Sequence, residues 1–84
     1  MTTYAEIYAG LCELLVPLAD EGKTVDEDSD LIADLGLSSL KIMDLLMEIE
    51  DRFDITVPLN VLPDVRTVRD FARQLEKLIQ EAHG

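Results

Sequence analysis

Two adjacent serines, Ser38 and Ser39, stand between a glycine-containing loop and a predicted helix. A serine at such a junction most often caps the helix with its hydroxyl oxygen, and either residue can do so. Two in a row also allow one to cap while the other projects. A helix N-terminus carries about half a positive charge and unpaired N–H groups, so it stabilises an attached phosphate. The pair is therefore a candidate site for a phosphate-linked group, beside the simpler interpretation of capping alone.

Residues suited to catalysis are sparse. The only histidine, His83, lies next to the C-terminus, where chains usually fray. The only cysteine, Cys12, flanks an apolar helical stripe without a nearby base, which favours a packing residue over a nucleophile. The stretch 36–40 lacks the second glycine of a hydrolase elbow, and its serines have no histidine as a base. We expect no enzyme activity.

Three aspartates resemble part of a calcium site. Asp26, Asp28 and Asp30 match positions 1, 3 and 5 of an EF-hand loop. Leu31 occupies the position of the required glycine, however, and Leu37 that of the bidentate glutamate. We therefore assign no metal ligand. Weak divalent binding by charge alone is the alternative, and it predicts that Mg²⁺ raises the melting temperature.

The chain has 84 residues, of which 48% are hydrophobic, and this suffices for one modest core. Its net charge of −11 repels nucleic acid and anionic membranes and favours a basic protein partner. No apolar run is long enough to span a membrane, no secretion signal is visible, and one cysteine cannot form an internal disulfide. We expect a single domain over residues 1–84, a cytoplasmic monomer that binds neither nucleic acid nor membrane.

The negative charge is concentrated in one part of the chain. Residues 20–54 hold twelve acids and three bases, a net charge of −9, whereas the other residues hold six acids and four bases, a net charge of −2. A solvated face explains such a run, and so does a docking surface for a basic partner.

Apolar residues at three- and four-residue spacing predict a first helix that begins near Tyr4, where Thr3 and Glu6 form a capping box, and whose end is marked by Pro17, Asp20 and Gly22. By the same pattern the last helix begins at Thr67, which forms a capping box with Asp70. The two apolar stripes are Tyr4, Ile7, Tyr8, Leu11, Leu14, Leu15 and Leu18, and Val68, Phe71, Leu75, Leu78 and Ile79.

A second helix is predicted from about Ser39 to Arg52, and Leu40 lies at the edge of its apolar face. The residues of that face are Ile42, Met43, Leu46, Met47, Ile49 and Phe53. The residues of the opposite face are Lys41, Asp44, Glu48, Asp51 and Arg52.

The connections complete a helical fold. The sequence of residues 20–38 is typical of a packed loop, with a short helical turn near residues 30–33. We expect residues 53–58 to be extended. We expect residues 59–62 to form one helical turn that is closed by Pro63. The apolar anchors of the loop are Leu31, Ile32 and Leu35. Together these elements predict an all-α fold, a small four-helix bundle with three main helices, one short helix and a long first loop.

The segment 34–40, Asp-Leu-Gly-Leu-Ser-Ser-Leu, resembles the pattern Asp-x-Gly-x-Asp-Ser-Leu of the acyl carrier proteins, also called peptidyl or thiolation carriers. The likeness covers about residues 4–80. It implies a free-standing, acyl-carrier-like bundle without catalysis of its own. It also implies that a phosphopantetheinyl transferase moves 4′-phosphopantetheine from coenzyme A onto Ser39. The thiol of that arm would hold acyl or aminoacyl groups as thioesters, supplied by a loading ligase and used by downstream biosynthetic enzymes with basic docking patches.

The resemblance further implies that partners dock on the second helix. The corresponding positions are Leu40, Asp44, Met47, Glu50 and Asp51. Met47 has a second interpretation, packing in the core. The apolar interior would either sheath an acyl chain or form an ordinary core, and the residues concerned include Ile42, Leu46, Phe53, Val61 and Phe71.

Two positions depart from the family pattern. Ser38 stands where fatty-acid carriers usually have an aspartate that helps to engage the modifying enzyme and its Mg²⁺, and Lys41 stands where an acid is common. Both departures favour a specialised pathway, such as polyketide, aminoacyl or modified fatty-acid synthesis. Two alternatives stay open. One is a housekeeping carrier of fatty-acid synthesis, and the other is an unmodified acidic helical adaptor or divalent-ion-binding module.

Overall fold

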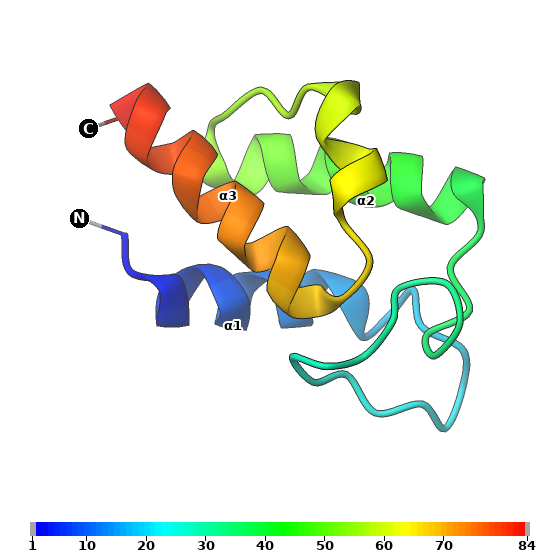
Figure 1. Cartoon of the computed structure of the whole chain (residues 1–84). Helices are drawn as coiled ribbons and strands as arrows, with labels where there is room; N and C mark the ends of the chain where they lie inside the picture. Colours follow the sequence, from blue (N-terminus) through cyan, green and yellow to red (C-terminus); the bar gives the residue numbers. More distant parts are fainter. Residues whose placement is uncertain (1, 84) are drawn as a thin grey trace.

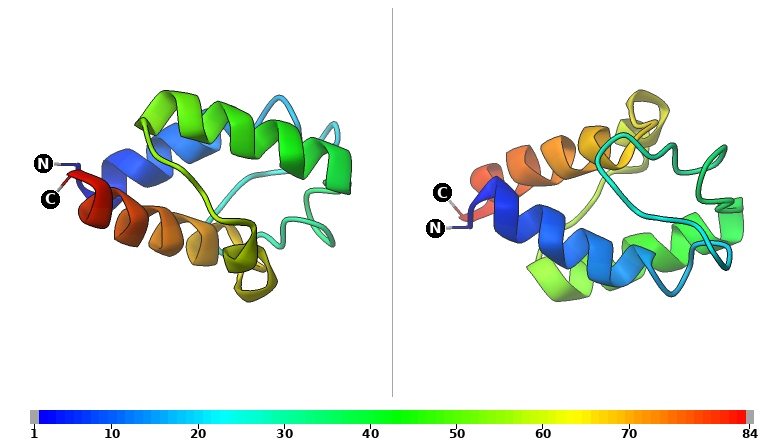
Figure 2. Two further views of the ribbon diagram at one scale, coloured as in Figure 1. Left: turned by 90° about the horizontal axis from the view of Figure 1, so that it is seen from above. Right: turned by 90° about the horizontal axis from the view of Figure 1, so that it is seen from below.

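The computed structural model describes residues 2–83, without the side chain of His83, and this part of the chain contains helices but no strand. The elements in chain order are α1 (Tyr4–Leu15), α2 (Ser39–Phe53), the short 3₁₀ helix η1 (Leu59–Asp64) and α3 (Val68–His83) (Figure 1). Helix α1 packs against both α2 and α3, and α1 begins at the end of the molecule where α3 finishes (Figure 2). The predicted four-helix bundle is confirmed. Within the described range, no helix combines the length and apolar character needed to cross a membrane.

Local capping sets the first residues of α1 and α3, as predicted. Thr3 Oγ1 accepts a hydrogen bond from the Glu6 N–H at 3.2 Å, and the Thr3 hydroxyl donates to the Glu6 carboxylate at 3.2 Å. At α3 the box is reciprocal, since the Asp70 N–H donates to Thr67 Oγ1 at 3.2 Å and the Thr67 N–H donates to Asp70 Oδ2 at 3.1 Å. These bonds satisfy N–H groups that have no partner inside the helix.

Helix α1 ends at Leu15, two residues before Pro17, the first of the three residues that mark its end in the sequence. The reason is Pro17, which has no N–H to donate to the carbonyl four residues earlier. The chain then tightens into a turn in which the N–H groups of Leu18 and Ala19 both donate to the Leu15 carbonyl at 2.9 Å. The turn directs the long loop away from the helix axis.

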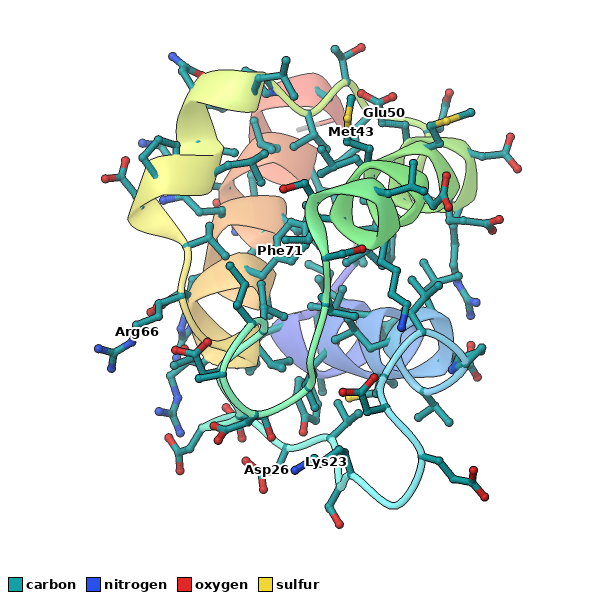
Figure 3. All side chains as sticks on the ribbon, turned by 90° about the vertical axis from the view of Figure 1, so that its right-hand side faces the viewer. Lys23, Asp26, Met43, Glu50, Arg66 and Phe71 are labelled. Atoms are coloured by element: carbon teal, nitrogen blue, oxygen red, sulfur yellow. The ribbon has the colours of Figure 1, made fainter. Side chains whose placement is uncertain are left out.

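One apolar core holds the three long helices together, and Phe71 points from α3 into it (Figure 3). Gly10 of α1 packs closely against the ring of Phe53 at the end of α2. A Cβ at Gly10 would lie only 2.9 Å from Phe53 Cζ, so a larger residue does not fit there without a shift of the ring. The other fully buried large residues are Ile7, Leu11, Leu15, Leu35, Leu45, Ile49, Val68 and Leu75.

The buried face of α2 differs from the predicted one. Met43 and Met47, assigned to the apolar face, are 55% and 69% exposed, whereas Leu45, assigned to neither face, is fully buried. Leu46 and Ile49 are buried as predicted. Apolar residues cover more than half the circumference of α2, so helical periodicity alone does not select which arc meets α1 and α3. Packing leaves a stripe of apolar residues on the outside.

The long loop is packed, as predicted, but one of its three anchors is wrong. Leu31 and Leu35 are buried, while Ile32 is 65% exposed. The short helical turn is present, because the N–H groups of Asp34 and Leu35 donate to the Asp30 carbonyl at 3.0 Å. Asp30 Oδ1 caps that turn by accepting from the N–H groups of Ile32 and Ala33. The side chain of Ile32 points out of the turn that its own backbone helps to form.

Three loop carboxylates that resembled calcium ligands have other partners. Asp26 Oδ1 accepts from the Asp28 N–H at 2.9 Å, and Asp28 Oδ1 accepts from Arg69 Nη1 at 2.6 Å. Asp30 pairs with Arg66 at 3.7 Å. Residues 2–83 contain no cluster of three or more histidine, cysteine or acidic side chains placed to hold a metal ion. The loop acids thus serve as backbone caps and as ion-pair partners of the start of α3.

The segment between α2 and α3 also departs from the prediction at two places. Asp54 ends α2 in the left-handed conformation, with φ 54° and ψ 52°, so the extended segment does not begin at Phe53. The one-turn helix is the longer η1, and Pro63 lies inside it rather than closing it. Pro63 donates no hydrogen bond within η1, and the Val65 N–H, just after the helix, donates to the Leu62 carbonyl at 3.0 Å.

Candidate functional site

The two candidate serines have separate roles in the structure. Ser38 is the N-cap of α2, with an extended backbone (φ −84°, ψ 169°) and with Oγ accepting a hydrogen bond from the Lys41 N–H at 3.2 Å. Ser39 is the first residue of the helix, is exposed, and has a hydroxyl without a hydrogen-bond partner among residues 2–83. One serine therefore caps the helix and the other projects into solvent.

The loop that delivers these serines is held by Gly36 and Asp20. Gly36 has φ +72°, in the left-handed region that glycine tolerates best, and a Cβ there would lie 1.9 Å from Asp20 Oδ2. The Asp20 N–H donates to the Leu35 carbonyl at 3.0 Å, and Asp20 Oδ1 pairs with Lys41 Nζ at 3.8 Å. Asp20 thus contacts both the loop before the serines and the first turn of α2 after them.

The start of α2 fits a phosphate group on Ser39. The helix has 15 residues and no acidic residue of its own in its first turn, so no side chain of that turn repels a phosphate at the positive end of the helix. The N–H groups of Ser39 and Leu40 precede the first intrahelical hydrogen bonds and are free to face an anion. Both the helix dipole and these backbone donors therefore favour an anionic group at this end of α2.

The outward face of α2 carries apolar and acidic side chains together. Leu40 and Met47 are 72% and 69% exposed, so packing in the core does not account for Met47. Asp44 and Asp51 are exposed on the same helix. Met43, which sequence reasoning assigned to the core, adds a second exposed thioether. A mixed surface of this kind suits a protein partner.

Glu50 has a different environment from the other predicted docking residues. Its side chain is half-buried, and Oε2 accepts a hydrogen bond from the Val57 N–H at 2.8 Å. This bond holds the segment after α2 against the helix. The sequence carried no signal of it, because the donor lies seven residues away and outside the helix.

Cys12 and His83 are the two residues outside the serine pair that the sequence analysis considered for catalysis. Cys12 is half-buried and free of any disulfide. Burial, and secondly a hydrogen bond with Cys12, raises the pKa of Tyr8 to about 12. The side chain of His83 lies outside the described residues.

The five residues named as a possible sheath for an acyl chain are all part of the core or packed against it. Leu46 and Phe71 are buried, and Ile42, Phe53 and Val61 are partly buried. An ordinary core would bury the same residues, so their burial does not favour the sheath over an ordinary core.

Comparisons with known proteins give consistent matches. A family model described as a phosphopantetheine attachment site matches residues 9–75. The chain is 30% identical over 80 residues to the meromycolate extension acyl carrier protein of Mycolicibacterium smegmatis, covering 94% of this chain and 81% of that protein. It is 37% identical over 54 residues to an acyl carrier protein of a Sulfurovum species, covering 64% of this chain and 72% of that protein.

Solved structures agree with these matches. The acetyl actinorhodin acyl carrier protein of Streptomyces coelicolor superposes with a TM-score of 0.68 and 26% identity, covering 89% of this chain and 92% of the other. The hexanoyl form of the carrier from the actinorhodin polyketide synthase of the same organism gives a TM-score of 0.71 at 24% identity, over 98% and 95% of the two chains, and supports the fold.

Proposed function

We propose, because this chain belongs to the phosphopantetheine-attachment family of acyl carrier proteins, that Ser39 carries the 4′-phosphopantetheine arm. The observation that carries the proposal is the division between the serines. Ser38 uses its hydroxyl oxygen to cap α2, and Ser39 leaves an exposed hydroxyl at the positive end of the helix. A transferase can therefore modify Ser39 without breaking any hydrogen bond of its side chain.

The chain acts as a tether and has no catalytic role of its own in this proposal. When the arm is bound, its terminal thiol holds an acyl or aminoacyl group as a thioester. The protein supplies a rigid helix start for the phosphate and a surface for docking, so that the tethered group has a high effective concentration at the docked enzyme. Residues 1–84 serve as one carrier domain, and a monomer suffices for this role.

The partners follow from the same role. Members of the family interact with phosphopantetheinyl transferases and with biosynthetic enzymes. We assign docking to the outward face of α2, through Leu40, Asp44, Met47 and Asp51, and leave Glu50 a structural role. Loading enzymes and downstream enzymes with basic patches fit these acids. Because coenzyme A is an intracellular metabolite, we expect the chain to act in the cytoplasm.

A specialised biosynthetic pathway fits this carrier better than housekeeping fatty-acid synthesis. The similar proteins include carriers named for meromycolate extension and for actinorhodin synthesis. Two residues depart from the pattern of fatty-acid carriers. Ser38 directly precedes the attachment serine, and Lys41 lies two residues after it, in the first turn of the docking helix. The ion pair with Asp20 offsets part of the positive charge of Lys41 and keeps this departure compatible with a basic partner.

The test is intact-protein mass spectrometry after incubation with coenzyme A, Mg²⁺ and a broad-specificity phosphopantetheinyl transferase. We expect wild type, Ser38→Ala and Ser38→Asp to gain the mass of one phosphopantetheine, and Ser39→Ala to gain none. Ser38→Asp is the matched control, since aspartate also caps a helix. A gain in Ser39→Ala would place the arm elsewhere. No gain in wild type with several transferases would favour the unmodified acidic adaptor.

A further inference from the structure

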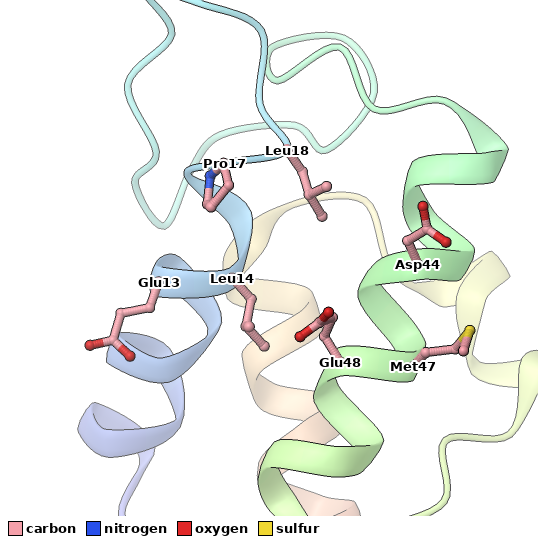
Figure 4. Close-up of a pocket in the computed structure, with 7 residues that line it drawn as sticks. All are labelled: Glu13, Leu14, Pro17, Leu18, Asp44, Met47 and Glu48. Carbon is pink, nitrogen blue, oxygen red and sulfur yellow. The ribbon is translucent and has the colours of Figure 1, made fainter.

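A cleft of about 370 Å³ lies between α1 and α2, on the side of the molecule next to the docking face (Figure 4). On its α1 side, Leu14 together with Pro17 and Leu18 of the turn that follows forms an apolar wall, and Glu13 stands at the rim. Its α2 side carries Met47 and the carboxylates of Asp44 and Glu48. In Figure 4, Glu48 points from α2 across the gap towards Leu14. The cleft therefore has an apolar wall on one helix and two acids on the other.

The two acids of the cleft have no ion-pair partner among residues 2–83. Asp44 and Glu48 are four residues apart on one helix, where like charges repel. The two bases of α2 are engaged elsewhere, since Lys41 pairs with Asp20 and Arg52 pairs with Glu13 at the rim of the cleft. The fold thus neutralises Glu13 but leaves two negative charges beside the apolar wall.

These features select the chemistry of an occupant. An arginine or lysine side chain has a long apolar stem and a cationic head, which match the apolar wall and the two acids. An uncharged acyl chain would take water away from the carboxylates without compensation. The volume lies at the low end for small-molecule pockets, so it suits one side chain rather than a whole helix.

We propose that this cleft receives one long basic side chain of an enzyme docked on α2, so that α1 forms part of the docking surface. The inference rests on the proposed carrier function, because it concerns the same partners. A neighbouring surface depression shares Met47 and Glu48 with the cleft and extends to Asp51. A partner that covers the outward face of α2 would therefore reach the cleft without leaving that surface.

The test uses the phosphopantetheine-loaded full chain, labelled with ¹⁵N, and two small probes. N-acetyl-arginine amide carries the cationic head, and N-acetyl-citrulline amide is its uncharged analogue of nearly equal shape. We expect arginine, and not citrulline, to shift the amide signals of Leu14, Leu18, Asp44 and Glu48. Glu48→Gln should weaken the arginine effect about two- to fivefold, the size expected for one exposed charge pair. Glu21→Gln, which removes an exposed loop acid, should leave it unchanged.

Three results would overturn the inference. Arginine shifts of equal size at all exposed acids would show a general response to the net charge. Equal shifts with citrulline would show that the cleft does not distinguish a cationic probe from an uncharged one. Shifts at the same residues on loading with an acyl group, without any probe, would assign the cleft to the acyl chain. Ser39 loading is measured by mass in the same samples, and the titration is repeated on the unloaded chain, so failure of the carrier role and failure of the cleft are distinguished.

Discussion

At the end of the long loop, two serines with identical side chains have different surroundings. Ser38 has the extended backbone of a helix cap and directs its oxygen to the Lys41 N–H, whereas Ser39 is already helical and faces solvent. Gly36 turns the chain just before this point with a positive φ, and the Asp20 carboxylate lies against it. The position of the proposed attachment serine thus depends on a contact with a residue sixteen positions before the glycine.

Gly36→Ala should lower the free energy of unfolding more than Gly22→Ala does. Both glycines have positive φ, so each alanine incurs the left-handed penalty of about 1–2 kcal/mol. Only at Gly36 would the new Cβ displace the Asp20 carboxylate and its ion pair with Lys41, because nothing lies within 4 Å of a Cβ at Gly22. Urea denaturation measures both, and an Asp20→Ala background should shrink the difference. Equal effects would contradict the role of Asp20.

At the scale of the elements, the acidic loop is held to α1 and α3 by specific contacts. Glu27 accepts a hydrogen bond from the Tyr4 hydroxyl at 2.8 Å and pairs with Arg69 at 3.4 Å. The Val68 N–H donates to the Ser29 carbonyl at 3.0 Å, next to the bridge between Asp30 and Thr67. Arg66 and Arg69 at the start of α3 therefore pair with three of the loop acids, Glu27, Asp28 and Asp30, and offset part of the negative charge of the loop.

The cap of α3 predicts a pH dependence of stability. Hydrogen bonds from the backbone N–H groups of Thr67 and Arg66 hold the pKa of Asp70 below its ordinary value of 3.8. A depressed carboxyl pKa stabilises the fold above the ordinary value, and this contribution is lost as the pH falls through the folded-state value. Asp70→Asn should therefore make the loss of stability below pH 3.8 less steep than in wild type.

Urea denaturation across that pH range measures this slope. Glu81→Gln, which removes an exposed acid near the other end of α3, is the control for the loss of one charge. Identical slopes in wild type and Asp70→Asn would show that the cap does not contribute to acid stability.

At the scale of the whole molecule, compactness and net charge oppose each other. The radius of gyration is 11.9 Å, close to the roughly 12 Å expected of a packed chain of this length. A net charge of −11 favours expansion by self-repulsion, and the ion pairs between the loop and α3 relieve only part of it. The apolar core must therefore hold the bundle together against its own charge.

Added salt should accordingly raise the melting temperature. Screening weakens both the repulsion and the exposed ion pairs, and the excess of acids over bases makes the repulsion the larger effect. Thermal unfolding in 10 mM buffer with NaCl increased to about 0.15 M measures the change, and MgCl₂ at equal ionic strength tests for divalent binding beyond screening. A melting temperature that stays constant or falls with NaCl would show that the ion pairs dominate.

The sequence alone determined the features that depend on neighbours within one helical turn. The capping pairs Thr3 with Glu6 and Thr67 with Asp70 start their helices as predicted, because donor and acceptor are three residues apart. The tertiary structure decided which apolar arc of α2 is buried, that Met47 is exposed, and that Glu50 binds the Val57 N–H. It also placed Leu14 opposite Glu48. Burial depends on partners that only the packing of distant segments supplies, so the local pattern cannot contain it.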